Sequence, residues 1–487
     1  MSLLKKLAGE TALYGLSSII GRFINYLILV PLYTRVFAPG EYGVVSQLYA
    51  YSGFLMVLFS YRLESAFFRF GNEQTDRQNV YSTAMLSLIG STTLLVTSIL
   101  LFSGTIADWL NYTAHPEYIR YFALIIGLDC LCELPFAKLR LEQRPRHFVA
   151  ARLLNIGVNI LFTLFWLVVC PWAAAQGFSW INAVWSPQVG VGYVFLANLI
   201  ASAVTVLFLL PQIRRIQLHF DWVLWKKMIR YAAPLMIAGF AGIANEMLDR
   251  AVMPYLLTGT AKENMATLGI YSATYKLAMM ITLFTQAYRY AAEPFFFRTA
   301  QNADALKLQA DSTKWFTIIG AVGMLGILLF LDIIKWFLGK KFQSGLDAVP
   351  VLLLANLFLG LFYNFSVWYR LKDRTMTGAW IAILGALLTL LLNIWWVPLM
   401  GYMGAAWATL ACYIFMSAAT WWTGRVLHPV PYPLARMGAF VGLALGLYVV
   451  SLWIKPLLPG TGLSLLGNCI LMLGYLGVVW MEYRRNP

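Results

Sequence analysis

Five charged side chains lie inside the two stretches, near residues 231–257 and 267–290, that are otherwise apolar enough for a membrane. An ionisable group at membrane depth is costly, and it usually faces a water-filled cavity or a partner on a transport path. The five are Glu246, Asp249, Arg250, Lys276 and Arg289. This part of the chain therefore predicts a binding or transport path through the membrane.

Arg22 lies about half-way along the first apolar stretch, with Asn25 three residues later. This depth makes it hard for the guanidinium to snorkel to either membrane interface. Lys276 is placed similarly in its own stretch, with Tyr271 and Tyr275 about one turn away. For each of the two cations, two interpretations stay open: the side chain lines a cavity, or it forms a buried structural pair.

Two other cations have an acid four residues away along the chain. Glu246 precedes Arg250, and Glu293 follows Arg289. Acids and bases at this spacing form ion pairs on a helix surface. For Arg250 this pair and a cavity role are equally open, whereas for Arg289 a structural pair is favoured. Asp249 points about 100° away from Arg250 around the helix, so the two need not neutralise each other.

Asp129 and Glu133 form an acidic counterpart one turn apart, and hence on one face of a helix. Two neighbouring carboxylates in a low dielectric raise each other's affinity for a proton, so they could form a proton or cation site. Alternatively, they neutralise Arg22 or Arg152 from neighbouring helices. Both interpretations stay open.

Enzyme chemistry is not indicated by the residues that usually carry it. The four histidines are isolated from one another, and no zinc-type ligand spacing or GxxxxGK[ST] motif is present. The five cysteines lie in or at the ends of apolar stretches: Cys130, Cys132, Cys170, Cys412 and Cys469. We therefore expect a protein that is not an enzyme, with no metal and no cofactor except a coupling proton or sodium ion.

The elements that must position these residues are membrane helices. The chain has 487 residues, of which 60% are hydrophobic and 12% charged, and its mean hydropathy is +0.69. This composition excludes an ordinary soluble protein. The net charge of +15 does not indicate nucleic-acid binding, because the basic residues sit in short loops between apolar stretches.

The sequence predicts an all-α, multi-pass membrane protein with about fourteen transmembrane helices. Lys and Arg collect in alternate loops, which predicts that both termini lie in the cytoplasm. The expected helices lie near residues 11–33, 43–61, 80–102, 118–138, 148–170, 190–211, 231–257, 267–290, 315–337, 346–368, 376–397, 402–423, 434–454 and 462–481.

Two segments of the first half recur in the second. Gly43 to Tyr49 resembles Gly269 to Tyr275, and Arg140 to Arg144 resembles Arg370 to Arg374. We interpret this as a duplication of six helices, with lobes at 1–215 and 216–427 in parallel orientation around a central cavity, typical of alternating-access transporters. Residues 428–487 hold a trailing helix pair, which either packs against lipid or forms a groove for a substrate's tail.

The chain resembles the polysaccharide transporters of the multidrug/oligosaccharidyl-lipid/polysaccharide exporter superfamily, which include O-antigen and lipid II flippases. The matching motifs are Leu32-Tyr33-Thr34-Arg35 with Gly40-Glu41-Tyr42-Gly43, Ala233-Pro234 with Leu248-Asp249-Arg250, and Leu268-Gly269-Ile270-Tyr271-Ser272. The resemblance covers essentially the whole chain. It implies a V-shaped cavity between two six-helix lobes that opens alternately to each side.

The resemblance also implies that cations in this cavity hold the pyrophosphate of a polyprenyl-linked sugar, a role that falls on Arg22, Arg250 and Lys276. We expect Asn25, Tyr271 and Tyr275 to line the same cavity. The predicted function is a flippase of the inner membrane that moves a lipid-linked oligosaccharide, such as an O-antigen unit, to the outer leaflet. Its expected partners are that substrate, membrane lipids and the polysaccharide polymerase or glycosyltransferase machinery, with no nucleic acid.

Two rivals stay open. A multidrug or cation antiporter of the same fold would place Asp129, Glu133 and Asp249 at the centre of function. A membrane scaffold for cell-surface synthesis would transport nothing.

Overall fold

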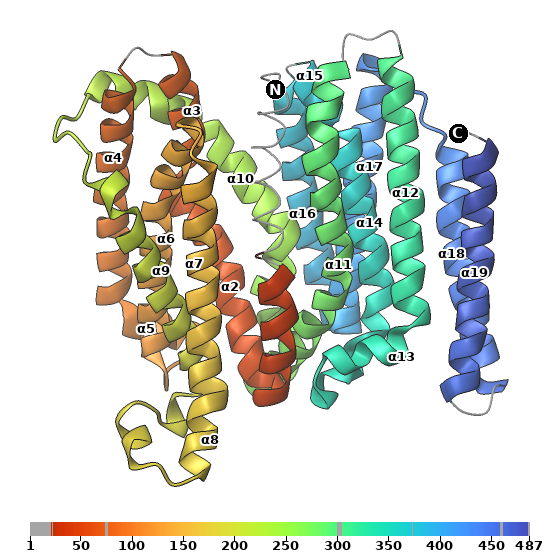
Figure 1. Cartoon of the computed structure of the whole chain (residues 1–487), viewed down its shortest axis with the longest axis horizontal. Helices are drawn as coiled ribbons and strands as arrows, with labels where there is room; N and C mark the ends of the chain where they lie inside the picture. The colour runs from red at the N-terminus through yellow and green to blue at the C-terminus, as the bar shows by residue number, and fades with distance from the viewer. Residues whose placement is uncertain are drawn as a thin grey trace. The chain divides into compact units, whose positions relative to one another are not determined.

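The structure is a computed structural model, and it describes residue 21 and residues 23–73, 76–299, 304–372, 374–457 and 461–485. Within these ranges every regular element is a helix (Figure 1). Arg22 and most of the stretch expected at 11–33 lie outside the described residues. A short apolar helix, Phe23–Val36, comes first. The others are α2 (Pro39–Ser60), α3 (Leu63–Glu73), α4 (Arg77–Leu101), α5 (Ser103–Trp109), α6 (Pro116–Leu141), α7 (Pro145–Leu164), η1 (Phe165–Val169), α8 (Cys170–Ala175), η2 (Ser179–Ala183), η3 (Pro187–Val189), α9 (Gly192–Ile213), α10 (Trp222–Leu256), α11 (Ala261–Thr299), α12 (Ala305–Leu329), α13 (Leu331–Ile334), η4 (Lys335–Phe337), η5 (Lys340–Ala348), α14 (Val349–Phe365), α15 (Val367–Leu371), α16 (Thr375–Met400), α17 (Tyr402–Leu427), α18 (Leu434–Ile454), η6 (Lys455–Leu457) and α19 (Thr461–Arg485).

Ten helices within the described ranges are long and apolar enough to cross a membrane. The predicted all-α, multi-pass membrane fold is therefore confirmed. The expected spans near 118–138, 231–257 and 267–290 coincide with α6, α10 and α11, which are 26, 35 and 39 residues long but are not among the ten. These three helices carry the internal charges discussed above, which lower their hydropathy. The total of about fourteen spans stays a prediction.

Helix starts follow the local sequence. Pro39, Pro116 and Pro145 each occupy the first turn of a helix, where the missing N–H costs nothing. Asp76 caps α4 by accepting hydrogen bonds from the backbone N–H groups of residues 78 and 79 at 3.1 and 3.0 Å. Asp221 caps α10 in the same way, accepting from Leu224 N at 2.9 Å.

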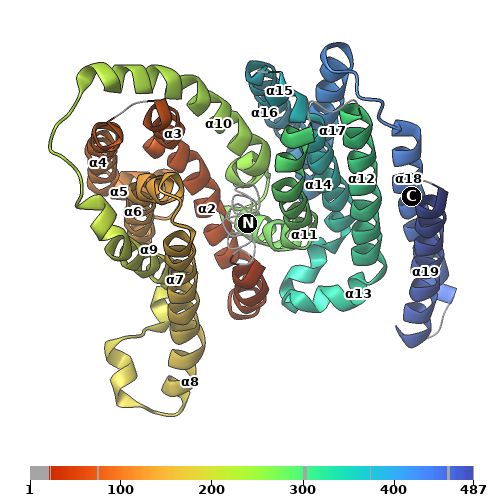
Figure 2. The same cartoon turned by 45° about the horizontal axis from the view of Figure 1, so that its top comes forward.

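The chain divides into two compact units, Met1–Gly269 and Ile270–Pro487. In the first unit, α6 packs against α4 and α9, α7 packs against α9, and α2 packs against α10 (Figures 1 and 2). Phe122 of α6 lies between Tyr49 and Phe195, with ring centroids 5.4 and 4.9 Å apart. This aromatic core joins α2, α6 and α9. The predicted lobe boundaries at 215/216 and 427/428 concern the sequence repeat and stay a prediction.

Within the first unit, the start of α2 crosses the start of α11 so closely that the two backbones are in contact. A Cβ on Gly43 would lie 2.1 Å from the Met265 carbonyl oxygen, and a Cβ on Gly269 would lie 1.8 Å from the Pro39 carbonyl oxygen. The two contacts are reciprocal, because the same number of residues separates Pro39 from Met265 and Gly43 from Gly269. Reciprocal contacts are what two copies related by a two-fold axis produce. The duplication into two six-helix lobes nevertheless stays a prediction.

In the second unit, α14 packs against α17 and α12, and α17 packs against α16. The trailing helices α18 and α19 lie side by side and both contact α12 (Figures 1 and 2). Asn468 of α19 donates to the Leu329 carbonyl at 2.6 Å, and Tyr475 donates to the Phe440 carbonyl at 3.1 Å. Near the other end of α19, Glu482 lies 3.6 Å from the buried ammonium of Lys314. Polar contacts thus fasten the trailing pair to α12.

Candidate functional site

The charges of α10 occupy different environments. Asp249 is buried, with 3% of its surface exposed, whereas Arg250 is half-buried and Glu246 is exposed. The Asp249 carboxylate accepts a hydrogen bond from the backbone N–H of Arg250 at 2.8 Å, and Arg250 Nη1 donates to the Glu246 backbone carbonyl at 3.0 Å. The positive charge of Arg250 also acts on Tyr42 of α2. Arg250 therefore lies towards α2, within the first unit.

Asn25 of the first helix is half-buried. Its Oδ1 is buried and has no hydrogen-bond partner within the described part of the chain. An unsatisfied buried acceptor is costly, so a donor from a ligand or water would be favoured there. Arg22, predicted beside it, lies outside the described residues.

The acids of α6 lie among cations of the first unit. Asp129 accepts a hydrogen bond from the Ser202 hydroxyl of α9 at 2.6 Å. The positive charge of Arg152 in α7 acts on both Asp129 and Glu133. The guanidinium of Arg152 itself lies over the Phe136 ring, 4.2 Å from its centroid. The two carboxylates thus share one cationic neighbour while each has its own surroundings.

Glu133 also contacts the break between α2 and α3. The helix is interrupted by Tyr61 and Arg62, whose φ angles of 33° and 56° are left-handed. Ser60, the last residue of α2, hydrogen-bonds to Glu133, and the charge of Arg62 acts on the same carboxylate. Such φ values are uncommon for residues other than glycine, so surrounding contacts must hold them.

Glu64 and Arg140 complete this group, and their side chains form an ion pair. The Arg140 guanidinium also lies over the Phe68 ring at 5.0 Å. We call Arg62, Glu64, Glu133 and Arg140 the break cluster. It contains two acids and two bases, so its formal charges balance.

The predicted residues of α11 beyond Gly269 belong to the second unit. Tyr271 and Tyr275 are buried, with 0% and 5% of their surfaces exposed. Their rings pack edge to face, with centroids 5.9 Å apart. Lys276 is half-buried beside them. The two tyrosines therefore pack against each other inside the second unit, and their predicted role beside Lys276 stays a prediction.

Arg289 lies near the other end of α11, over the Tyr363 ring of α14 at 4.0 Å. It lines a shallow cleft together with Arg370. Its Nε is buried without a hydrogen-bond partner among the described residues. The side chain of Glu293, the predicted partner of Arg289, lies outside the described part of the structure.

This arrangement suits recognition of charge. In the first unit the charge of Arg152 acts on Asp129 and Glu133, while Asp249 contacts the backbone of Arg250 on α10. Within the described ranges, no group of three or more His, Cys, Asp or Glu side chains could hold a metal ion.

The sequence matches the family described as polysaccharide biosynthesis protein over residues 7–300. The chain belongs to this family. The resemblance inferred from the motifs is thereby confirmed. A comparison with curated proteins gives no match.

Solved structures share the fold of this family member. A structure described as lipid II flippase MurJ, in an inward closed conformation, matches with a TM-score of 0.75 and 13% identity, over 97% of this chain and 99% of that chain. An inward-facing multidrug resistance MATE family transporter of the MOP superfamily matches with a TM-score of 0.64 and 13% identity, over 88% of this chain and 95% of that chain. A point mutant of the MATE transporter VcmN of Vibrio cholerae matches with a TM-score of 0.57 and 10% identity, over 87% of this chain and 96% of that chain. At these identities the likeness establishes the fold alone.

Sequence reasoning missed the break cluster of this family member. Arg62 and Arg140 entered the sequence prediction only as basic loop residues that set orientation, and Glu64 carried no prediction. The contact of this group with Glu133 joins segments far apart in the chain. An acid and a base close together at a helix end, such as Arg62 and Glu64, are a weak signal for such a cluster. Arg370 was part of the repeat motif, but nothing in the sequence brought it beside Arg289.

Proposed function

We propose that the protein is a flippase that moves a polyprenyl-pyrophosphate-linked oligosaccharide, an O-antigen or other cell-surface repeat unit, to the outer leaflet of the inner membrane. The observation that carries this proposal is membership of the polysaccharide biosynthesis family over residues 7–300. The likeness to a flippase fold along nearly the whole chain supports it. The mechanism we propose is alternating access between two six-helix lobes.

We assign six residues to the pyrophosphate and the first sugars: Arg22, Asn25, Arg250, Lys276, Tyr271 and Tyr275. A bare charge costs several kcal/mol in hydrocarbon, so the head group needs a wet cleft with cations. Arginine suits this task because its planar guanidinium donates two parallel hydrogen bonds to phosphate oxygens. The polyprenyl chain can stay in lipid throughout.

Asp129, Glu133 and Asp249 are the residues that we assign to coupling with a proton or sodium ion. Each is at least half-buried in a helix that also carries a base or lies close to one. Protonation of one carboxylate would change the balance of charge in the first unit, which is how an ion could bias a two-state transporter. We place the protein in the inner membrane with both termini in the cytoplasm.

The proposal is tested by export of surface glycan in cells that depend on this protein. Arg250→Ala and Lys276→Ala should abolish export, while membrane insertion and thermal stability stay close to wild type. Arg425→Ala, which removes a basic residue at the end of α17, is the matched control and should export normally. Normal export by both the Arg250 and the Lys276 variants would reject the proposed substrate site.

A cation or drug antiporter is the rival with the same fold, supported by the matches to MATE transporters. It predicts that Asp129→Asn and Glu133→Gln abolish efflux of cationic dyes from loaded vesicles. The flippase proposal predicts no dye efflux by the wild-type protein, and translocation of a fluorescent lipid-linked oligosaccharide in the same vesicles. Dye efflux without lipid translocation would favour the rival.

A further inference from the structure

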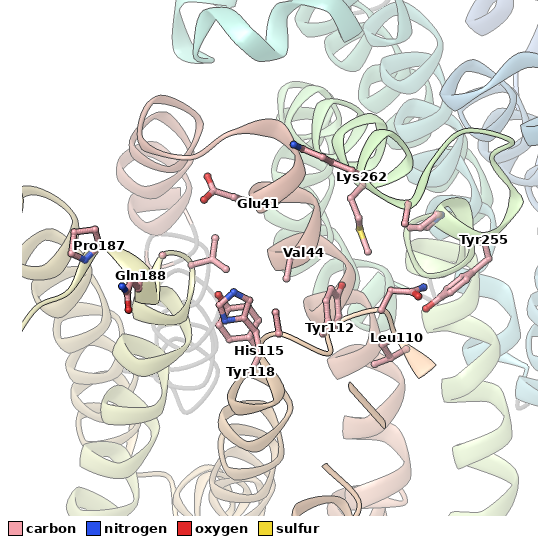
Figure 3. A pocket seen from close by; sticks show the side chains of 17 residues that line it. Glu41, Val44, Leu110, Tyr112, His115, Tyr118, Pro187, Gln188, Tyr255 and Lys262 are labelled. Atoms are coloured by element: carbon pink, nitrogen blue, oxygen red, sulfur yellow. The ribbon is translucent and has the colours of Figure 1, made fainter. Parts of the chain in front are cut away.

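A pocket of about 420 Å³ opens in the first unit, at the side that the charge distribution predicts to be the outer one. It lies where the starts of α2 and α11, the end of α10, the α5–α6 connection and the loop after η3 come together. In Figure 3, Glu41 and Lys262 lie across the hollow from His115, Tyr118 and Tyr112, with Tyr255 at one side and Gln188 at the other. Asn25, Arg250 and Lys276, the residues proposed above for the pyrophosphate that the structure describes, do not line this pocket.

Aromatic side chains make one wall of the pocket. His115 and Tyr118 are stacked, with ring centroids 4.7 Å apart and an interplanar angle of 6°. The Tyr118 hydroxyl donates to the Val189 carbonyl at 3.3 Å, and the His115 ring hydrogen-bonds to the Glu117 carboxylate through Nδ1 at 2.8 Å. Both rings are therefore held in place before any ligand arrives, which reduces the entropic cost of binding.

A chain of hydrogen bonds fixes the polar floor. The Tyr112 hydroxyl donates to the Gln47 side chain, whose amide donates to the Tyr51 hydroxyl at 3.0 Å. Tyr51 in turn donates to the Ala251 carbonyl at 3.2 Å, and its oxygen lies 3.0 Å from the hydroxyl of Tyr255. Because the Tyr51 proton goes to that carbonyl, Tyr255 donates to Tyr51. The Tyr255 oxygen keeps a lone pair that can accept a hydrogen bond from a ligand hydroxyl.

The rim of the pocket carries one acid and one base, Glu41 and Lys262, which are both exposed. Their charges balance, so the rim selects neither a phosphate nor a cation. Glu41 is held by its hydrogen bond from the Ala38 backbone N–H at 2.7 Å. Together with Gln188 these side chains offer both donors and acceptors around an apolar and aromatic wall, the usual make-up of a small-molecule site.

We propose that this pocket binds one or two sugar units of the glycan on the outer side of the membrane. A sugar has a ring of apolar C–H groups that fits an aromatic face, and hydroxyls that both donate and accept. Its neutrality matches the balanced rim. The volume is near the lower end for small-molecule pockets, which fits a mono- or disaccharide better than a whole repeat unit. This inference rests on the proposed function for the direction of transport.

The test uses the full-length protein in lipid nanodiscs and saturation-transfer NMR with glucose, galactose, N-acetylglucosamine, rhamnose and disaccharides of these sugars. At least one sugar should bind, with an affinity of roughly millimolar order as expected for so small a ligand. His115→Ala should weaken binding roughly 3–10-fold, the effect of losing one aromatic contact. Val44→Phe, which fills the pocket without removing a polar group, should abolish it.

Trp180→Ala is the matched control. Trp180 is an exposed aromatic residue of η2, in the α8–α9 connection that also carries Gln188, and it does not line the pocket. It should bind sugar like the wild type. Binding of none of the sugars, or equal affinity in the wild-type, His115→Ala and Val44→Phe proteins, would overturn the proposal. Glycerol phosphate that binds in place of the sugars would assign the pocket to an anion and would also overturn it.

The two proposals fail separately. If no sugar binds but Arg250→Ala and Lys276→Ala abolish export, the pocket proposal fails and the flippase proposal stands. If sugar binds here but those two variants export normally, the pocket proposal stands and the assigned pyrophosphate site fails.

Discussion

Gly269→Ala should open the crossing between the starts of α2 and α11. The new Cβ would lie 1.8 Å from the Pro39 carbonyl oxygen and 2.8 Å from its carbon. Carbon and oxygen in contact need more than 3 Å, so the two backbones must separate locally by roughly 1.5 Å. Backbone cannot rotate away as a side chain can. We therefore expect a loss of about 1–3 kcal/mol in the free energy of unfolding, the usual cost of overpacking.

Helix propensity works against this loss, since alanine is favoured over glycine by about 1 kcal/mol inside a helix. Gly90→Ala and Gly157→Ala are the matched controls, because a Cβ at either position meets nothing within 4 Å. They should be neutral or slightly stabilising. The assay is the thermal midpoint of the purified protein, followed by tryptophan fluorescence in detergent.

Gly43→Ala should behave like Gly269→Ala, since its Cβ would lie 2.1 Å from the Met265 carbonyl oxygen. The double variant should lose less than the sum of the two single losses, because one separation of the helices relieves both clashes. If Gly269→Ala is as stable as Gly90→Ala, the close crossing described above does not exist and the argument for reciprocal contacts fails with it.

Three further substitutions test charged contacts. Glu482→Gln should lower the free energy of unfolding by about 2–3 kcal/mol, because Lys314 is 3% exposed and Asp311, the other acid beside it among the described residues, is more exposed. Chemical unfolding measures this difference, and no loss would contradict the pairing. A hydrogen bond from Lys455 holds the pKa of Asp332 below its usual value. The stability from Asp332 is therefore present above the unfolded-state pKa of about 4 and is lost as the pH falls through the folded-state pKa. Asp332→Asn should lower the free energy of unfolding by no more than about 1 kcal/mol at neutral pH, since the pair is partly exposed. This difference should shrink as the pH falls below about 4. Thermal midpoints of both proteins, measured from neutral pH down to about pH 2, show whether it does. Glu133→Gln should lower the free energy of unfolding by about 1–3 kcal/mol, because Arg62 loses the carboxylate on which its charge acts. An unchanged thermal midpoint would remove the break cluster as a stabilising element.

Much of the helical arrangement could be predicted because membrane helices are encoded locally. Runs of about 20 apolar residues, Pro39 and Pro116 at helix starts, and the basic loops each carry their information within a short window. The repeat motif at Gly43 and Gly269 was also visible. That these two glycines lie against each other's helix was not, because the contact depends on how the two copies are placed in space.

The candidate site was less predictable for the same reason. Asp129 and Glu133 were recognised as a pair by their spacing, but the cation beside them, Arg152, was one of two possibilities. Tyr271 and Tyr275 were expected to line a cavity, which stays a prediction, and their packing against each other was not readable from the sequence. The outer pocket depends on Tyr112 and other side chains from five separate segments, so no local pattern could indicate it.

The trailing helices are tied to α12 near both ends of α19, through Asn468 and Leu329 on one side and Glu482 and Lys314 on the other. A helix held at two points can neither slide nor swing away from its neighbour. A reporter dye attached at Arg485 would therefore follow the displacement of α12, which makes this end of α19 a convenient handle for single-molecule recordings.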